Sequence, residues 1–102
     1  MRIITSRTVK EWTAQHADAA GPLEKWMALI EDGEWRNLTE MRGVFSSADE
    51  VVVKSGRPVV VFNIKGNTYR LIAAIHYNTK IVYVFFFLTH AEYAKDQWKK
   101  VL

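Results

Sequence analysis

Three β-prone segments in the second half of the chain, separated by short polar turns, constrain the fold most strongly. They cover residues 59–65, 68–77 and 80–88 and are rich in β-branched and aromatic side chains. Gly66-Asn67 and Asn78-Thr79 lie between them, as is typical of hairpin connections. Three strands joined in this way form an antiparallel meander. Because both of its faces are largely apolar, we expect helices to cover much of it.

The first half of the chain carries signals for helix ends. Caps and breaks occur at four places: Thr8 with Glu11, Gly21-Pro22, Asp32-Gly33, and Asn37 with Glu40. They predict a helix from Thr8 to Gly21-Pro22, a second that stops at Asp32-Gly33, and a short third from Asn37. The second helix has apolar residues at helical spacing: Leu23, Trp26, Met27 and Ile30.

A second capping box, formed by Thr89 and Glu92, predicts a last helix. Its apolar stripe consists of Ala91, Ala94, Trp98 and Val101, while another face carries His90, Tyr93 and Gln97. Residues 2–5 form a short β-prone run, and residues 45–57 form a loop whose valines 51–53 suit an extended segment.

These segments predict an α+β fold. N-terminal helices pack on an antiparallel sheet, made of the three-strand meander with a short N-terminal strand at residues 2–5, and a C-terminal helix follows. At 102 residues the chain is one domain, residues 1–102, since a second core would not fit within this length.

Composition narrows the class of protein. No segment approaches the roughly 20 apolar residues of a membrane span, and residues 1–5 lack the apolar core of a signal peptide. The chain has no cysteine, which removes disulfides, thiolate nucleophiles and cysteine zinc sites together. We therefore expect a cytoplasmic protein without a membrane partner.

Charge is distributed unevenly along the chain. Residues 1–53 carry six Lys/Arg and nine Asp/Glu, a net −3, whereas residues 54–102 carry eight and two, a net +6; the sum is the overall +3. A basic half beside an acidic half fits one surface for a polyanion such as RNA. Uneven charge is also common in small soluble domains, so this pattern alone leaves both interpretations open.

Alternation along residues 68–77 separates two sets of side chains. One face takes a convincing core set: Tyr69, Leu71, Ala73, Ile75 and Tyr77. Arg70 points to the opposite face, where its guanidinium offers a planar fork that matches phosphate oxygens. An ion pair with a helix carboxylate is the equally weighted alternative.

His90 lies in the first turn of the predicted last helix, where backbone N–H groups attract anions and favour a neutral imidazole base. Tyr93 follows one turn later, on the same side of the helix. Lys65 and Lys95 add positive charge nearby. The alternatives are an exposed histidine, a tyrosine packed on the sheet, and solvated lysines.

Metal and nucleophile signals are weak. The three histidines, His16, His76 and His90, are widely spaced, and none has a carboxylate at a ligand spacing. We predict no metal and no cofactor. Ser46-Ser47 lacks the surroundings of a nucleophile elbow.

The chain resembles the HigB-type toxins of bacterial type II toxin–antitoxin systems. Three segments carry the resemblance: Phe62-Asn63-x-x-Gly66-Asn67-x-x-Arg70-Leu71, Thr89-His90-x-Glu92-Tyr93, and Val44-Phe45-x-Ser47-x-Asp49. The resemblance implies a RelE-like fold and an mRNA interferase, an endoribonuclease that cuts mRNA on the translating 70S ribosome. It also implies neutralisation by a HigA-like antitoxin with a helix-turn-helix domain.

Carried over by position, the resemblance places Arg70, His90 and Tyr93 in the catalytic site, with Asn67 nearby. Lys65, Asn67 and Lys95 are our candidates for RNA binding, although the position of Lys65 varies in the family. The implied reaction is attack of the ribose 2′-OH on the adjacent phosphate without a metal. Arg70 would stabilise the phosphorane and His90 would act as acid or base, with Tyr93 stacking on a base or completing proton transfer. A non-catalytic RNA- or ribosome-binding module is the main alternative, and a protein-interaction domain is the third.

Overall fold

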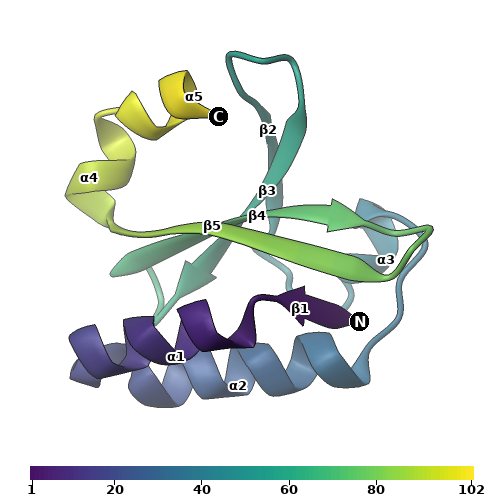
Figure 1. Cartoon of the computed structure of the whole chain (residues 1–102), viewed down its shortest axis with the longest axis horizontal. Helices are drawn as coiled ribbons and strands as arrows, with labels where there is room; N and C mark the ends of the chain where they lie inside the picture. Colours follow the sequence, from purple (N-terminus) through teal and green to yellow (C-terminus); the bar gives the residue numbers. More distant parts are fainter.

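The computed structural model describes residues 1–102 and has five strands between two unequal helical layers (Figure 1). The elements, in chain order, are β1 Arg2–Ile4, α1 Ser6–Gln15, the 3₁₀ helix η1 Ala17–Ala19, α2 Ala20–Asp32, α3 Leu38–Met41, β2 Asp49–Val52, β3 Pro58–Ile64, β4 Tyr69–His76, β5 Ile81–Thr89, α4 His90–Ala94 and α5 Gln97–Val101. The predicted α+β fold is confirmed. No helix is both long and apolar enough to cross a bilayer.

The sheet has the strand order β1-β5-β4-β3-β2. Its centre is the predicted meander, in which β4 is antiparallel to both β3 and β5. The meander gains one strand at each edge: β1 pairs in parallel with β5, and β2 pairs antiparallel to β3. The two weaker β-prone segments are thus the edges of the sheet. Phe85 is the extra residue of a β-bulge in β5, since Ile72 faces Phe86 and Ala73 faces Val84.

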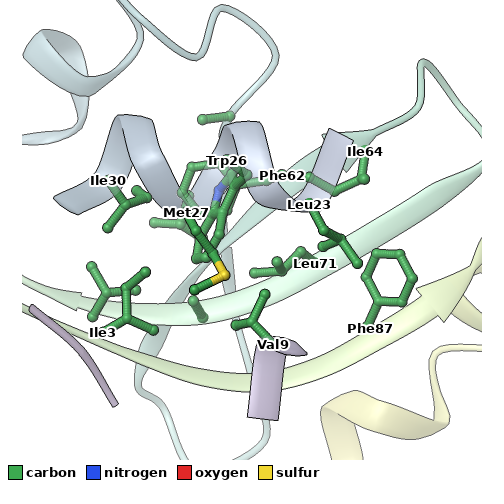
Figure 2. Packing of buried hydrophobic residues seen from close by; sticks show 14 of the residues in the cluster. Ile3, Val9, Leu23, Trp26, Met27, Ile30, Phe62, Ile64, Leu71 and Phe87 are labelled. Carbon is green, nitrogen blue, oxygen red and sulfur yellow. The ribbon is translucent and has the colours of Figure 1, made fainter. Parts of the chain in front are cut away.

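The main core lies between α1, α2 and one face of the sheet (Figure 2). Leu23, Trp26, Met27 and Ile30 of α2 are all buried, which confirms the predicted amphipathic stripe. Across from them lie Phe62 and Leu71, and Trp26 meets the ring of Phe62 edge to face at 5.4 Å. The alternation predicted for β4 is therefore correct, because its odd-numbered residues supply this core.

A smaller cluster fills the opposite face, where α4 and α5 lie (Figure 1). It contains Val59, Val61 and Ile72 from the strands and Trp98 from α5. Helices thus cover both faces of the sheet, but the second covering is short and contributes one buried aromatic side chain.

The first two helices differ from the prediction. Thr5, not Thr8, is the N-cap of α1, and its hydroxyl accepts a hydrogen bond from the Thr8 backbone N–H. The break falls at His16 and η1, whereas Gly21-Pro22 lies inside the first turn of α2. Proline is tolerated there because the first N–H groups of a helix have no intrahelical acceptor.

A C-terminal helix begins after Thr89 as predicted, but it is shorter than predicted, because the chain breaks into α4 and α5 at Asp96. This residue is left-handed, with φ of 59°. The Tyr93 carbonyl accepts hydrogen bonds from the Asp96 N–H and from Trp98 Nε1, which closes α4. Of the predicted apolar stripe only Trp98 is buried; Ala91 and Ala94 are exposed, and so is Val101.

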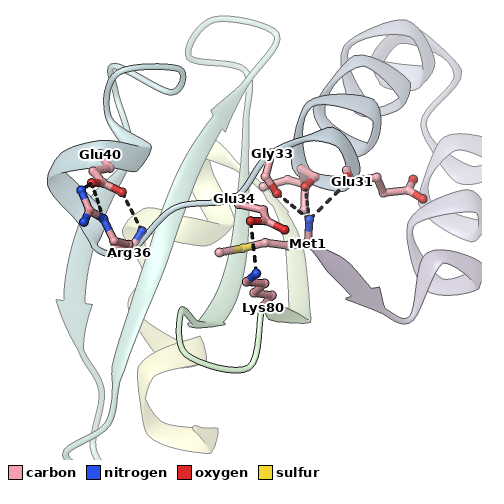
Figure 3. A network of polar contacts seen from close by, with 8 residues as sticks. Met1, Glu31, Gly33, Glu34, Arg36, Glu40 and Lys80 are labelled. Carbon is pink, nitrogen blue, oxygen red and sulfur yellow. Dashed lines mark hydrogen bonds and ion pairs between the residues drawn. The ribbon is translucent and has the colours of Figure 1, made fainter.

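Polar contacts connect Met1 and Lys80 to the end of α2 and the residues that follow it (Figure 3). The amino group of Met1 donates to the carbonyls of Ile30 and Gly33 at the end of α2, at 2.8 and 2.6 Å. Lys80 pairs with Glu34 nearby. Asn37 caps α3 as predicted, with its side chain accepting from the N–H of Glu40, and Glu40 also pairs with Arg36.

Candidate functional site

The candidate site lies where the β3–β4 turn meets the start of α4. Lys65 and Gly66 are both left-handed, with φ of 55° and 62°, so the turn is tight and glycine suits its second position. The backbone N–H of His90 donates to the Thr68 carbonyl at 3.1 Å. This bond fixes the first residue of α4 against the turn, 22 residues earlier in sequence.

Arg70 lies at the centre of the site and is 9% exposed. Its Nη1 donates to the carbonyls of Asn67 and Tyr69 at 3.1 Å, and its Nη2 approaches Asn67 Oδ1 at 3.4 Å. None of the six ion pairs includes Arg70, so the expected alternative of a helix carboxylate is not found. The guanidinium is thus a nearly buried cation held by neutral groups.

His90 is exposed, and its Nδ1 lies 3.3 Å from Nη2 of Arg70. Arginine has no hydrogen-bond acceptor, so Nδ1 must accept this bond and carry no proton. In this contact Nδ1 is the acceptor, which corresponds to the tautomer with its hydrogen on Nε2. Arg70 and His90, 20 residues apart in sequence, thus lie within hydrogen-bond distance of each other.

Tyr93 is half-buried beneath the guanidinium, with Arg70 Cζ 5.6 Å from its ring centroid. The Tyr93 ring also stacks against the ring of Trp98, with the ring centroids 5.3 Å apart and an interplanar angle of 18°. Trp98 therefore supports the site from α5. This role is not predictable from the sequence, where Trp98 fits an apolar stripe, because its contact with Tyr93 depends on the break at Asp96.

Of the three candidate RNA-binding residues, Asn67 contacts Arg70, whereas Lys65 and Lys95 do not. Asn67 contacts Arg70 directly through its backbone and side-chain oxygens. Lys65 is held by Asp18 of η1, with Nζ 3.1 Å from the carboxylate, and both side chains are about half exposed. Lys95 lies at the end of α4 beside a shallow hollow lined by Phe86 and Leu88, without a polar contact to Arg70.

Asp18 was not predicted, yet it connects η1 to the sheet. It accepts from the hydroxyl of Tyr69 at 2.9 Å as well as from Lys65. The hydrogen bond from Tyr69 contributes most to lowering the pKa of Asp18, and Lys65 contributes next. The hydrogen bond between Asp18 and Tyr69 also raises the pKa of Tyr69. No spacing signal in the sequence points from residue 18 to residues 65 and 69.

The capping box of α4 is confirmed in both directions: Thr89 accepts from the Glu92 N–H, and Glu92 accepts from the Thr89 N–H. The hydrogen bond from the Thr89 backbone N–H contributes most to lowering the pKa of the Glu92 carboxyl, and the Thr89 side chain contributes next. The carboxylate next to His90 is thus engaged in holding the helix start. His16 packs its ring against Tyr69 and Phe87, in agreement with a structural role. No three His, Asp or Glu side chains gather closely enough to hold a metal ion.

The model of the HigB toxin family, described as the RelE-like toxic component of a toxin–antitoxin system, matches residues 19–96. The match includes the β3–β4 turn, Arg70, His90 and Tyr93, and it excludes α5 with Trp98. A search of curated proteins finds no match to the chain.

Proposed function

This chain belongs to the HigB family of RelE-like toxins of toxin–antitoxin systems, and we propose that it is an endoribonuclease that cleaves mRNA on the translating ribosome. Cleavage would stop translation and growth, and a cognate antitoxin of the helix-turn-helix HigA type would neutralise it. The proposed site of action is the cytoplasm, where mRNA and the 70S ribosome are found.

The observation that carries this proposal is the unpaired guanidinium of Arg70. Buried charges in proteins are normally paired, because desolvation of an isolated ion is costly. Arg70 is 9% exposed and has no carboxylate partner. An RNA phosphate would supply the missing anion and match the fork of the guanidinium. His90, at 3.3 Å, would then lie next to the bound phosphate.

The proposed reaction is an internal transesterification. The ribose 2′ oxygen bonds to the adjacent phosphorus, the bond from phosphorus to the 5′ oxygen breaks, and the products are a 2′,3′-cyclic phosphate and a 5′-OH. One proton leaves the 2′-OH and one reaches the departing oxygen. Arg70 would stabilise the charge on the phosphorane, and His90 would carry one of the two protons.

Phosphate binding would change the role of His90. When Arg70 turns its N–H groups to a phosphate, Nδ1 of His90 loses its donor and becomes free to accept a proton. Tyr93 keeps the guanidinium in place through its ring face, and its hydroxyl is the second candidate for proton transfer. Asn67 would help to position Arg70 through its backbone carbonyl and its side-chain oxygen.

Induced expression in bacteria, with growth followed and mRNA 5′ ends mapped, tests the proposal. We expect growth arrest and new mRNA cuts with wild type, and loss of both with Arg70→Ala and His90→Ala. His76→Ala is a matched control, since His76 is also an exposed histidine and lies on the same face of β4 as Arg70. Loss of His90 should reduce cleavage by about 10²–10⁴-fold. Cuts that require translation would support ribosome dependence.

Intact mRNA with soluble wild-type protein would contradict the proposal. It would favour the alternative of a non-catalytic RNA- or ribosome-binding module, which binds phosphates with an affinity that falls steeply as salt rises. A protein-interaction domain would show neither cleavage nor salt-sensitive RNA binding.

A further inference from the structure

A hollow of about 270 Å³ lies beside β3, between α2 and residues 44–47. We propose that it is a base pocket, which takes the nucleotide adjacent to the phosphate bound by Arg70. This inference rests on the proposed ribonuclease function and adds a specificity site to it. The family match and the predicted catalytic residues assign no role to this hollow.

The hollow forms where the sheet edge is left open. β2 pairs with β3 only as far as Val61, so no strand covers the outer edge of residues 62–64. Residues 62–65 line one wall of the hollow, and Lys25 and Trp26 of α2 line another. Phe45 belongs to the remaining wall and packs edge to face on Phe62 at 5.1 Å. The shape is therefore set by a rigid strand and a packed helix.

The hollow lies on the α2 side of the sheet and Arg70 on the opposite face, but the two approach each other at the open strand edge of residues 62–64. Asn63, on its rim, lies opposite Arg70 in the β3–β4 register, and such cross-strand Cα atoms are about 5 Å apart. Nδ2 of Asn63 donates to Oδ1 of Asn67 at 3.4 Å, and the same oxygen lies 3.4 Å from Nη2 of Arg70. An RNA with a phosphate at Arg70 that passes over this open strand edge would bring a neighbouring nucleotide to the hollow.

The lining chemistry favours a nucleotide over a protein segment. Its polar groups include the exposed hydroxyls of Ser46 and Ser47 and the amide of Asn63, which can donate to and accept from base edges. Lys25 is exposed and belongs to none of the ion pairs, so its ammonium is free for a phosphate. No Asp or Glu lines the hollow. The pocket thus combines an apolar wall, base-reading groups and positive charge.

Base preference at the cuts tests the pocket. We would map mRNA 5′ ends in cells that express wild type or the double variant Ser46→Ala/Ser47→Ala. Wild type should favour particular bases on one side of the cut, and removal of the two hydroxyls should weaken this preference about tenfold, the effect of one or two hydrogen bonds. Ser55→Ala is the control: Ser55 is an exposed serine outside the hollow, and this change should alter neither preference nor growth arrest.

An unchanged preference in the double variant, beside active wild type, would overturn the base pocket and leave the ribonuclease standing. If wild type makes no cuts, the proposed function fails and the pocket fails with it. Hydrogen exchange with a 2′-O-methyl RNA, which lacks the attacking hydroxyl, gives a second readout. Slower exchange of residues 44–47 and 62–65 supports the pocket; protection by the antitoxin alone would assign the hollow to a protein partner instead.

Discussion

The sheet face under α1 and α2 and the face under α4 and α5 share the same central strands but differ in how they are covered. The first belongs to a cluster of 19 buried residues, and the second to a cluster of five. The second face also holds the nearly buried cation Arg70. A thin covering leaves one edge of this face near solvent, where a charge and an exposed histidine can meet a ligand. One face therefore holds most of the buried core, and the other holds the proposed site.

The largest expected effect is that of Arg70→Lys on RNA cleavage. Lysine keeps the charge but loses the planar fork and the stack on Tyr93, so cleavage should fall by about 10²–10³-fold. The melting temperature should stay close to that of wild type, since the face contributes little to the main core. Single-turnover cleavage and thermal melting measure the two effects. Arg57→Lys is the matched control on this face, where Arg57 lies over Phe85; a large loss of stability in Arg70→Lys would break the division between the faces.

Phe62→Ala should mainly destabilise the protein, because Phe62 is a core residue of the face under α1 and α2; it also lines the proposed base pocket. Phe62 is 1% exposed and touches Trp26 and Phe45. We expect the free energy of unfolding to fall by about 3–5 kcal/mol, from the lost transfer energy and the cavity. Phe86→Ala, at a half-buried position on the other face, should cost about 1–2 kcal/mol. Urea unfolding measures both, and equal losses would show that the two faces contribute alike.

A smaller effect is expected at the cap of α4. Thr89→Ala removes the hydroxyl that accepts the Glu92 N–H, which should cost about 0.5–2 kcal/mol. Because His90 follows directly, cleavage should fall as well, whereas Thr89→Ser keeps the cap and should preserve both properties. Parallel melting and cleavage assays of the two variants would test this. Full activity in Thr89→Ala would show that the Thr68 carbonyl alone fixes His90.

The smallest effect concerns acid stability at Asp18. Its pKa is lowered in the folded protein by Tyr69 and Lys65, so its contribution to stability is present above the unfolded value of 3.8. That contribution is lost as the pH falls through the lower folded value. Asp18→Asn should therefore be less stable than wild type at neutral pH, and the difference should shrink below pH 3.8. Urea titrations at several pH values would reveal it; a difference that is constant with pH would rule out the carboxylate as its source.

Much of the fold follows from local signals in the sequence. The meander, the buried stripe of α2 and the caps at Asn37 and Thr89 depend on residues close in sequence, and all four are confirmed. The break at Asp96 could not be predicted in this way, since it depends on the Tyr93 carbonyl accepting from Trp98. The start of α1 was misplaced because Thr5 and Thr8 both suit an N-cap, and Thr5 takes the role.

For the site, too, local signals predict where single residues lie but not which residues touch. Alternation places Arg70 away from the core, and the cap places His90 at a helix start, so both positions were predictable. Their contact at 3.3 Å depends on the β4–β5 register, and the tie of Asp18 to Lys65 depends on the packing of η1 against the sheet. These tertiary contacts leave no periodic trace in the sequence.

The pairing of β1 with β5 has a consequence for synthesis. Arg2 faces Ile81, so the first strand to leave the ribosome must wait for nearly 80 further residues before its partner exists. Contacts this distant in sequence slow folding, because the intervening chain must be ordered first. His90 is synthesised later still. A nascent chain of this protein therefore cannot complete its sheet until β5 has been synthesised, nor its Arg70–His90 pair until residue 90 has been added.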